Sequence, residues 1–302
     1  MTVKRWKQCI TIFVLSLILI LIALVVFLAV RCGNLQKEHE AAVNVSADNA
    51  QEDSAISIDA SKLSRFFDSA QQFEYQKKYK NLYIENDFAY KPREEKICYL
   101  TFDDGPSTEN TKRILDILQE HNVKATFFVI NKEGDEAESL YKRIVKDGHT
   151  LGIHSASHDY AKIYKSVDAY LKDFNIISNR IEEVTGVKPD IFRFPGGSVN
   201  SYNADIYVPL AAEMLRRGYT YYDWNVSSGD ASLTILSKET ICKNVVNGMY
   251  DKGENIVLLH DSNEKDSTVE ALSGIIETLS AQGYTFAKLD NKVMPIIFNY
   301  LS

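Results

Sequence analysis

The chain has 302 residues, of which 45% are hydrophobic and 25% are charged, and only four are cysteines. This composition excludes a wholly disordered or collagen-like chain, and also a scaffold built on disulfides. The first 32 residues hold four basic residues and no acidic one, so the remaining 270 hold 30 basic and 41 acidic residues, a net charge of −11. So acidic a surface argues against nucleic acid as a partner and leaves small molecules, neutral glycans or other proteins.

The N-terminal region predicts a single membrane anchor. Cys9–Val30 is a run of 22 residues in which only Thr11 and Ser16 are mildly polar. As a helix it spans about 33 Å, enough to cross a hydrocarbon core of roughly 30 Å. Basic side chains precede the run, so the positive-inside rule places residues 1–8 in the cytoplasm and the rest of the chain outside the plasma membrane. The alternative is a cleaved signal peptide, but the run exceeds its usual length of roughly 7–15 residues and no small-x-small site follows.

The remainder divides into a polar spacer and one main domain. We expect a flexible linker at 31–60, a short helical or extended segment at 61–94, a catalytic domain at 95–290 and a C-terminal tail at 291–302. Of the four cysteines, Cys98 and Cys242 lie outside the membrane segment, far apart in the sequence. They either form a disulfide or remain two separate thiols.

From residue 95 onward, short apolar runs alternate with stretches of helical periodicity. Strands are predicted at Ile97–Phe102, Ala125–Ile130, Thr150–His154, Ile191–Phe194, Thr220–Val226, Ile256–His260 and Thr285–Leu289. Helices are predicted near 110–121, 136–147, 166–185, 203–217, 237–250 and 267–281. Seven strands joined by six crossover helices imply an α/β fold with a parallel sheet, either open or closed into a barrel.

Unusual polar residues follow five of these strands, at the edge where such folds gather their active groups. The segments are Thr101-Phe102-Asp103-Asp104-Gly105-Pro106, His154-Ser155-Ala156-Ser157-His158, Arg193-Phe194-Pro195-Gly196-Gly197, Ser227-Ser228-Gly229-Asp230 and Leu258-Leu259-His260-Asp261. Each segment alone has an ordinary structural explanation. Their common position at one edge of the sheet predicts an active site there.

Two of these segments predict a metal site. His154 and His158 have i, i+4 spacing, which on a helical turn aims both imidazoles at one ion. Asp103 and Asp104 could merely cap a turn, but Gly105 and the proline after it hold both carboxylates at the sheet edge. Two histidines and one carboxylate with an open position form the ligand set of a hydrolytic zinc site.

The remaining segments are less specific. An arginine at a strand end, Arg193, is more plausibly paired with a carboxylate than exposed as a surface cation. His260, which follows four apolar residues, is either a core histidine or a functional group of the same site.

In this order, the segments T-F-D-D-G-P, H-S-x-x-H, R-x-P, a late Asp and L-L-H-D closely resemble the polysaccharide deacetylase family (NodB homology, carbohydrate esterase family 4). The resemblance covers roughly residues 95–290. It implies a distorted (β/α)7-type barrel. It also implies removal of acetyl groups from N-acetylated glycans such as chitin or peptidoglycan, or in some members from O-acetylated xylan.

The resemblance also implies roles for individual residues. Asp104, His154 and His158 hold a divalent metal, most often Zn²⁺. Asp103 is the general base that Arg193 orients, and His260 is the general acid. Asp230 is the carboxylate that adjusts His260, with Asp223 as the alternative. Gly196, Gly197 and Leu258 are the residues expected to contact the substrate and the oxyanion.

Two positions depart from the family pattern. The family often has an aromatic residue at the place of Gly196 and a tryptophan after the late Asp, where this chain has Ala231. Because His260 is retained, and amines need acid catalysis more than alkoxides do, we expect N- rather than O-deacetylation. A tethered domain that faces the cell wall makes cell-wall glycan the expected substrate, at N-acetylglucosamine of peptidoglycan. The alternatives are an esterase for O-acetylated polysaccharide and an inactive wall-binding scaffold.

Overall fold

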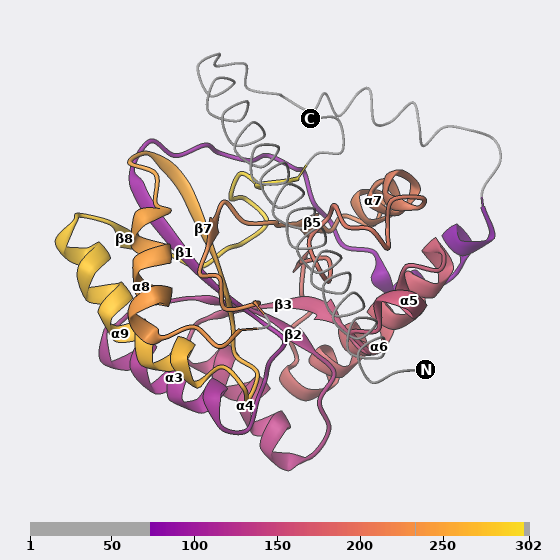
Figure 1. Cartoon of the computed structure of the whole chain (residues 1–302). Helices are drawn as coiled ribbons and strands as arrows, with labels where there is room; N and C mark the ends of the chain where they lie inside the picture. Colours follow the sequence, from indigo (N-terminus) through magenta and orange to yellow (C-terminus); the bar gives the residue numbers. More distant parts are fainter. Residues whose placement is uncertain (1–72, 233, 299–302) are drawn as a thin grey trace, which may run out of the picture. The chain divides into compact units, whose positions relative to one another are not determined.

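The computed structural model describes residues 73–232 and 234–298 (Figure 1). The predicted cytoplasmic tail, membrane anchor and linker, residues 61–72 of the predicted segment that follows, and residues 299–302 of the predicted C-terminal tail lie outside these residues. The described residues belong to one compact unit spanning Ser69–Ser302. Within them, none of the helices combines the length and the apolar character that crossing a membrane requires.

Strands and helices alternate as the hydrophobic pattern predicts. The strands are β1 (Lys96–Asp103), β2 (Thr126–Ile130), β3 (Thr150–Ser155), β4 (Ile191–Phe192), β5 (Thr220–Tyr221), β6 (Val226–Ser227), β7 (Gly253–His260) and β8 (Thr285–Phe286). The helices are α3 (Asn110–Glu120), α4 (Asp135–Lys146), α5 (Tyr160–Ile163), α6 (Val167–Thr185), α7 (Tyr207–Arg216), α8 (Lys238–Asn247) and α9 (Asp266–Ala281). Two short 3-10 turns, η2 (Glu74–Lys77) and η3 (Lys80–Leu82), precede β1.

The strands form one parallel sheet in the order β5-β4-β3-β2-β1-β7-β6. β7 pairs along the whole of β1, whereas β2 pairs only with Thr101–Asp103 at its end. β8 pairs with Ile97 and Cys98 at the beginning of β1, on the side that β2 leaves free. Seven strands therefore follow one curled path, a distorted and incompletely closed barrel, with helices around its outside (Figure 1).

The predicted fifth strand, Thr220–Val226, is wrong as a single element. It is divided into β5 and β6, which stand at opposite ends of the strand order. Residues 222–225 form a bridge that carries the chain from one edge strand of the sheet, β5, to the other, β6, across the open side of the barrel. The backbone carbonyls of Tyr222 and Asp223 accept hydrogen bonds from the Arg193 side chain instead of from a neighbouring strand.

Two apolar clusters separate the inside of the barrel from its helical cover. Along β1, Ile97 and Tyr99 face the inner cluster, whereas Cys98, Leu100 and Phe102 belong to the outer cluster beneath the helices. Because strand side chains alternate, this register also directs the last residue of β1, Asp103, to the inner side. Cys98 is a free thiol, as is Cys242, so the two do not form a disulfide.

The segments before and after the barrel pack against it. Arg217, which is fully buried, donates hydrogen bonds to the backbone carbonyls of Tyr75, Lys78 and Tyr79. At the other end, Val293 is buried and pairs with Lys91 in an isolated bridge. Residues on both sides of the predicted domain limits thus contribute to the same core.

Candidate active site

The acidic turn after β1 places two carboxylates at the carboxyl edge of the sheet. Asp104 has a φ of +76°, a strained conformation for a residue with a side chain, and such strain is common at functional sites. The turn requires glycine next, because a Cβ on Gly105 would lie 2.1 Å from the Oδ2 atom of Asp261 behind it. The buried Oδ1 atom of Asp104 has no hydrogen-bond partner, so it remains free to bind a ligand.

The two histidines converge, but not on a helical turn as their spacing predicts. His154 belongs to β3, and His158 stands in the turn after it with a φ of +51°. The imidazole centroids are nevertheless 5.2 Å apart. Asp173 of α6 holds this turn, accepting hydrogen bonds from the Ser155 hydroxyl and from the backbone N–H groups of the next two residues. The two imidazoles are therefore brought together by a strand and a turn that Asp173 stabilises, and not by a helix.

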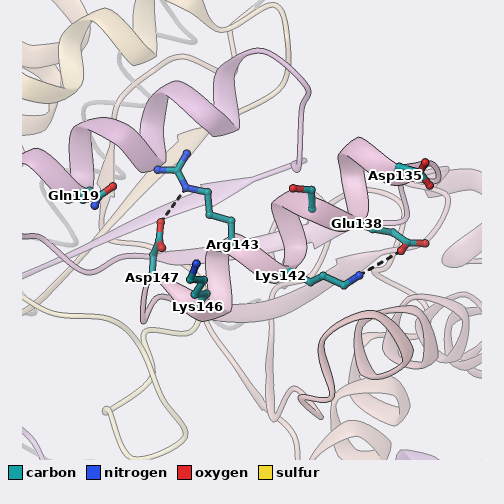
Figure 2. A pocket seen from close by; sticks show the side chains of 8 residues that line it. Gln119, Asp135, Glu138, Lys142, Arg143, Lys146 and Asp147 are labelled. Carbon is teal, nitrogen blue, oxygen red and sulfur yellow. Dashed lines mark hydrogen bonds and ion pairs between the residues drawn. The ribbon is translucent and has the colours of Figure 1, made fainter.

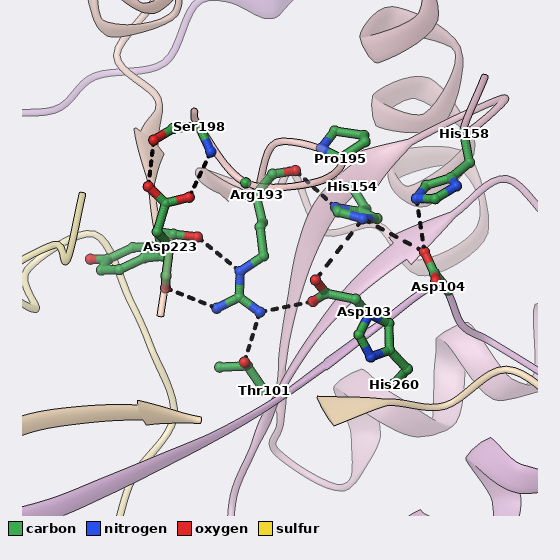
Figure 3. Close-up of polar contacts among 12 residues, drawn as sticks. Thr101, Asp103, Asp104, His154, His158, Arg193, Pro195, Ser198, Asp223 and His260 are labelled. Atoms are coloured by element: carbon green, nitrogen blue, oxygen red, sulfur yellow. Dashed lines mark hydrogen bonds and ion pairs between the residues drawn. The ribbon is translucent and has the colours of Figure 1, made fainter. Parts of the chain in front are cut away.

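Asp104, His154 and His158 together form a cluster suited to a metal ion (Figure 3). The Oδ1 atom of Asp104 is 3.6 Å from Nε2 of His154 and 3.2 Å from Nε2 of His158. Nδ1 of His154 donates to the backbone carbonyl of Arg193 at 2.9 Å, which orients the ring so that Nε2 points toward the cluster. Burial, together with neighbouring His154, lowers the pKa of His158 and favours the neutral imidazole that metal binding needs. The donor set fits a divalent cation.

Arg193 is fully buried and its guanidinium binds four oxygen atoms. Two are the bridge carbonyls of Tyr222 (2.8 Å) and Asp223 (3.1 Å). The others are the hydroxyl of Thr101 (2.7 Å) and the Oδ1 atom of Asp103 (2.9 Å). The predicted pairing of Arg193 with a carboxylate is confirmed, and the same side chain also joins the bridge to β1 (Figure 3).

His260 lies opposite Asp103 in the register of β1 and β7. Its Nδ1 atom donates to Oδ1 of Asp230 at 2.8 Å, while Oδ2 of Asp230 accepts from the His260 backbone N–H at 2.9 Å. Burial alone lowers the pKa of His260, but the hydrogen bond to Asp230 and nearby carboxylates outweigh it and raise the pKa to about 9. The alternative partner, Asp223, instead accepts from Ser198 and from the backbone N–H of Phe298.

Comparison with known proteins identifies the family and the fold of this chain. The family profile described as polysaccharide deacetylase matches residues 90–215. A peptidoglycan-N-acetylglucosamine deacetylase of Bacillus cereus is 35% identical over 196 residues, covering 65% of this chain and 87% of the relative. The chain belongs to the polysaccharide deacetylase family. Its metal-ligand cluster matches the kind of metal site that these enzymes use.

Solved structures agree with this assignment. The catalytic domain of a peptidoglycan N-acetylglucosamine deacetylase from Eubacterium rectale superposes with a TM-score of 0.65 at 41% identity, over 68% of this chain and 94% of that one. A Streptococcus mutans carbohydrate esterase family 4 esterase gives a TM-score of 0.60 at 29% identity, over 65% and 87%. The predicted family and barrel type are thereby confirmed.

The loop after Arg193 carries two glycines whose backbone lies in the left-handed region. Gly196 and Gly197 have φ values of +77° and +82°. A Cβ on Gly196 would lie 3.0 Å from the ring of Tyr160, so that ring occupies the space beside it. The predicted substrate residue Leu258 is buried two positions before His260, on the same side of β7. Its role and that of the two glycines in binding the substrate remain predictions.

Two positioning residues of this deacetylase were missed in the sequence. Asp173 holds the histidine turn from 15 residues further along the chain, and Thr101 donates to the Val257 carbonyl while accepting from Arg193. A carboxylate between buried Tyr170 and Phe174 of a helix was a usable signal for Asp173. Nothing in the local sequence of Thr101 separates it from an ordinary strand residue.

A separate hollow of about 790 Å³ lies along α4, between the outer helices. Its charged side chains pair among themselves, Arg143 with Asp147 at 3.0 Å and Lys142 with Glu138 at 3.6 Å (Figure 2). None of the predicted site residues lines it. The predicted site at the strand ends is therefore separate from this hollow.

Proposed function

We propose that the protein is a metal-dependent N-deacetylase of cell-wall glycan, acting on N-acetylglucosamine of peptidoglycan, with Zn²⁺ as the metal. The observation that supports this most strongly is the cluster of Asp104, His154 and His158 with a base candidate and an acid candidate beside it. Asp103 is fixed by Arg193, and His260 is fixed by Asp230. Amide hydrolysis needs all three functions in one place.

In the proposed reaction, a water oxygen forms a bond to the acetyl carbonyl carbon while Asp103 takes the water's proton. Arg193 binds Oδ1 of Asp103 and thereby leaves Oδ2 for this task. A divalent cation bound by the cluster supplies Lewis acidity, which polarises the carbonyl and lowers the pKa of water. The backbone N–H of Gly197 already donates to the Phe194 carbonyl at 2.9 Å, so the N–H of Gly196 is the one that stabilises the negative charge developing on the carbonyl oxygen.

The bond from carbon to nitrogen then breaks, and acetate and an amino sugar are released. The sugar nitrogen is a poor leaving group as an amide anion, so it must receive a proton as the bond breaks. His260 delivers that proton, and its raised pKa keeps it charged near neutral pH. The retained acid supports amide rather than ester substrates.

Two further observations support the substrate and the location. The B. cereus relative and the E. rectale structure are both named as peptidoglycan N-acetylglucosamine deacetylases. The apolar run Cys9–Val30 supports a plasma-membrane anchor with the catalytic domain outside the cell, where the wall is. The name of the S. mutans structure, an esterase, keeps O-acetylated polysaccharide as the second candidate.

Metal removal tests the proposed activity. The purified protein is expected to release acetate from chitooligosaccharides and peptidoglycan, to lose this activity with a chelator and to regain it with Zn²⁺. His158→Gln is expected to lower bound metal well below one ion per chain, whereas His121→Gln, at the end of α3, retains it. Acetate release only from acetylated xylan would identify the esterase instead. If no acetate is released from any of these substrates, the remaining alternative is the inactive wall-binding scaffold.

The pH dependence follows from the pair of His260 and Asp230. Protonated His260 is present below pH 9 and is lost as the pH rises through about 9, so kcat is expected to fall there. In Asp230→Asn the largest of the contributions that raise this pKa is gone, while Asp103 and Asp104 still raise it against the effect of burial, so the fall in kcat moves to lower pH. The measurement is kcat from pH 5 to 10, with Asp223→Asn as the control. An unmoved basic limb in Asp230→Asn contradicts the assignment of the acid.

A further inference from the structure

The loop after the Gly196–Gly197 pair carries a surface aromatic residue beside the site. Tyr202 is 56% exposed, and its ring makes a T-shaped contact with that of Tyr160, 5.4 Å between centroids. The Tyr160 ring in turn contacts that of the metal-ligand candidate His158 at 5.2 Å. One continuous aromatic edge therefore runs from the metal cluster to the protein surface.

The inner ring of this edge fills the space beside Gly196. A Cβ added at Gly196 would lie 3.0 Å from the ring of Tyr160, the first residue of α5. The start of α5 thus contributes an aromatic wall beside the loop after β4. Tyr202 extends it outward, away from the reacting centre.

The loop that presents Tyr202 is ordered by its own asparagines. The Oδ1 atom of Asn200 accepts from the Tyr202 backbone N–H at 2.9 Å, and its Nδ2 atom donates to the Gly197 carbonyl at 3.0 Å. Asn203 is fully buried and donates to the Ser198 carbonyl at 2.9 Å. An exposed ring on an internally bonded loop is preorganised, so little conformational entropy is lost when a ligand packs on it.

We infer that Tyr202 forms a subsite that stacks on a sugar ring of the glycan flanking the unit being deacetylated. A pyranose presents C–H groups on its faces and hydroxyls around its rim, so its faces pack on an aromatic ring while the rim stays in water. The inference rests on the proposed function for the identity of the polymer. It predicts that Tyr202 acts on binding of long chains and not on the chemical step.

The test compares chitopentaose with the shortest chitooligosaccharide that the protein turns over. For Tyr202→Ala we expect KM for chitopentaose to rise about 3–10-fold with kcat unchanged, the size of one aromatic contact, and less than a 2-fold change on the short substrate. Tyr202→Trp is expected to keep the low KM. The control is Tyr250→Ala, since Tyr250 is 57% exposed and precedes β7 at the opposite end of the barrel.

A calorimetric titration separates this subsite from the proposed activity. Chitopentaose is titrated into Asp103→Asn and into Asp103→Asn/Tyr202→Ala, neither of which needs turnover. Weaker binding to the double variant supports the subsite even if the wild-type protein releases no acetate from this oligomer. Equal binding, no binding to either protein, or an equal loss of kcat on short and long substrates would overturn the subsite.

Discussion

His260→Ala is expected to lower kcat for acetate release by about 10²–10⁴-fold, the usual contribution of a positioned general acid. The sugar nitrogen then leaves without a proton donor, while the groups that activate the carbonyl are untouched. Metal content is expected to stay at the wild-type level, because His260 is not one of the three residues in the cluster. Acetate release and metal stoichiometry are measured on the same preparation.

A structural role for His260 makes a different prediction. If the side chain only supports the fold, a lower rate will be accompanied by a lower melting temperature and by loss of metal. A better leaving group provides the discriminating control, since an activated aryl ester needs no proton donor. His260→Ala is expected to hydrolyse such an ester within a few-fold of the wild-type rate. Equal losses on ester and amide, or normal turnover of the amide, would remove His260 from the mechanism.

The sequence was sufficient for those parts of the molecule that depend on local pattern. Short apolar runs located the strands other than Thr220–Val226, and the metal and acid candidates that the motifs predicted lie at or just after the ends of β1, β3 and β7. Because parallel strands end at one edge, residues more than 100 positions apart could be placed together without coordinates. That is how Asp103 and His260 were assigned to one site.

What the sequence could not supply depends on single long-range contacts. The stretch Thr220–Val226 is rich in residues that favour strands, yet it breaks because Arg193, nearly 30 positions earlier, captures two of its backbone carbonyls. The ring that lies beside Gly196 comes from Tyr160, the first residue of α5. Neither contact produces a periodic pattern in the sequence. Each depends on a single side chain that reaches its partner only in the folded barrel.

Arg193→Met is expected to cost about 3–5 kcal/mol of unfolding free energy, the range found when one partner of a buried ion pair is removed. Methionine is apolar and of similar length, but the Asp103 carboxylate is left buried without its cation, and the contact of the guanidinium with the Phe128 ring, 4.4 Å from Cζ to the ring centroid, is lost. The bridge carbonyls of Tyr222 and Asp223 lose a donor at the same time. Urea unfolding of the metal-free protein measures the loss.

A double-mutant cycle identifies its cause. Asp103→Asn removes the charge that Arg193 neutralises, so adding it to Arg193→Met is expected to recover part of the lost stability, because no unpaired charge then remains buried. The surface pair of Arg113 and Asp266 is the matched control, with side chains 44% and 61% exposed, and Arg113→Met is expected to cost less than about 1 kcal/mol. If the double variant is no more stable than Arg193→Met, the bridge carbonyls rather than the ion pair account for the loss. If Arg193→Met is as stable as the wild type, Arg193 does not hold the barrel closed, and its four hydrogen bonds serve only to orient the base.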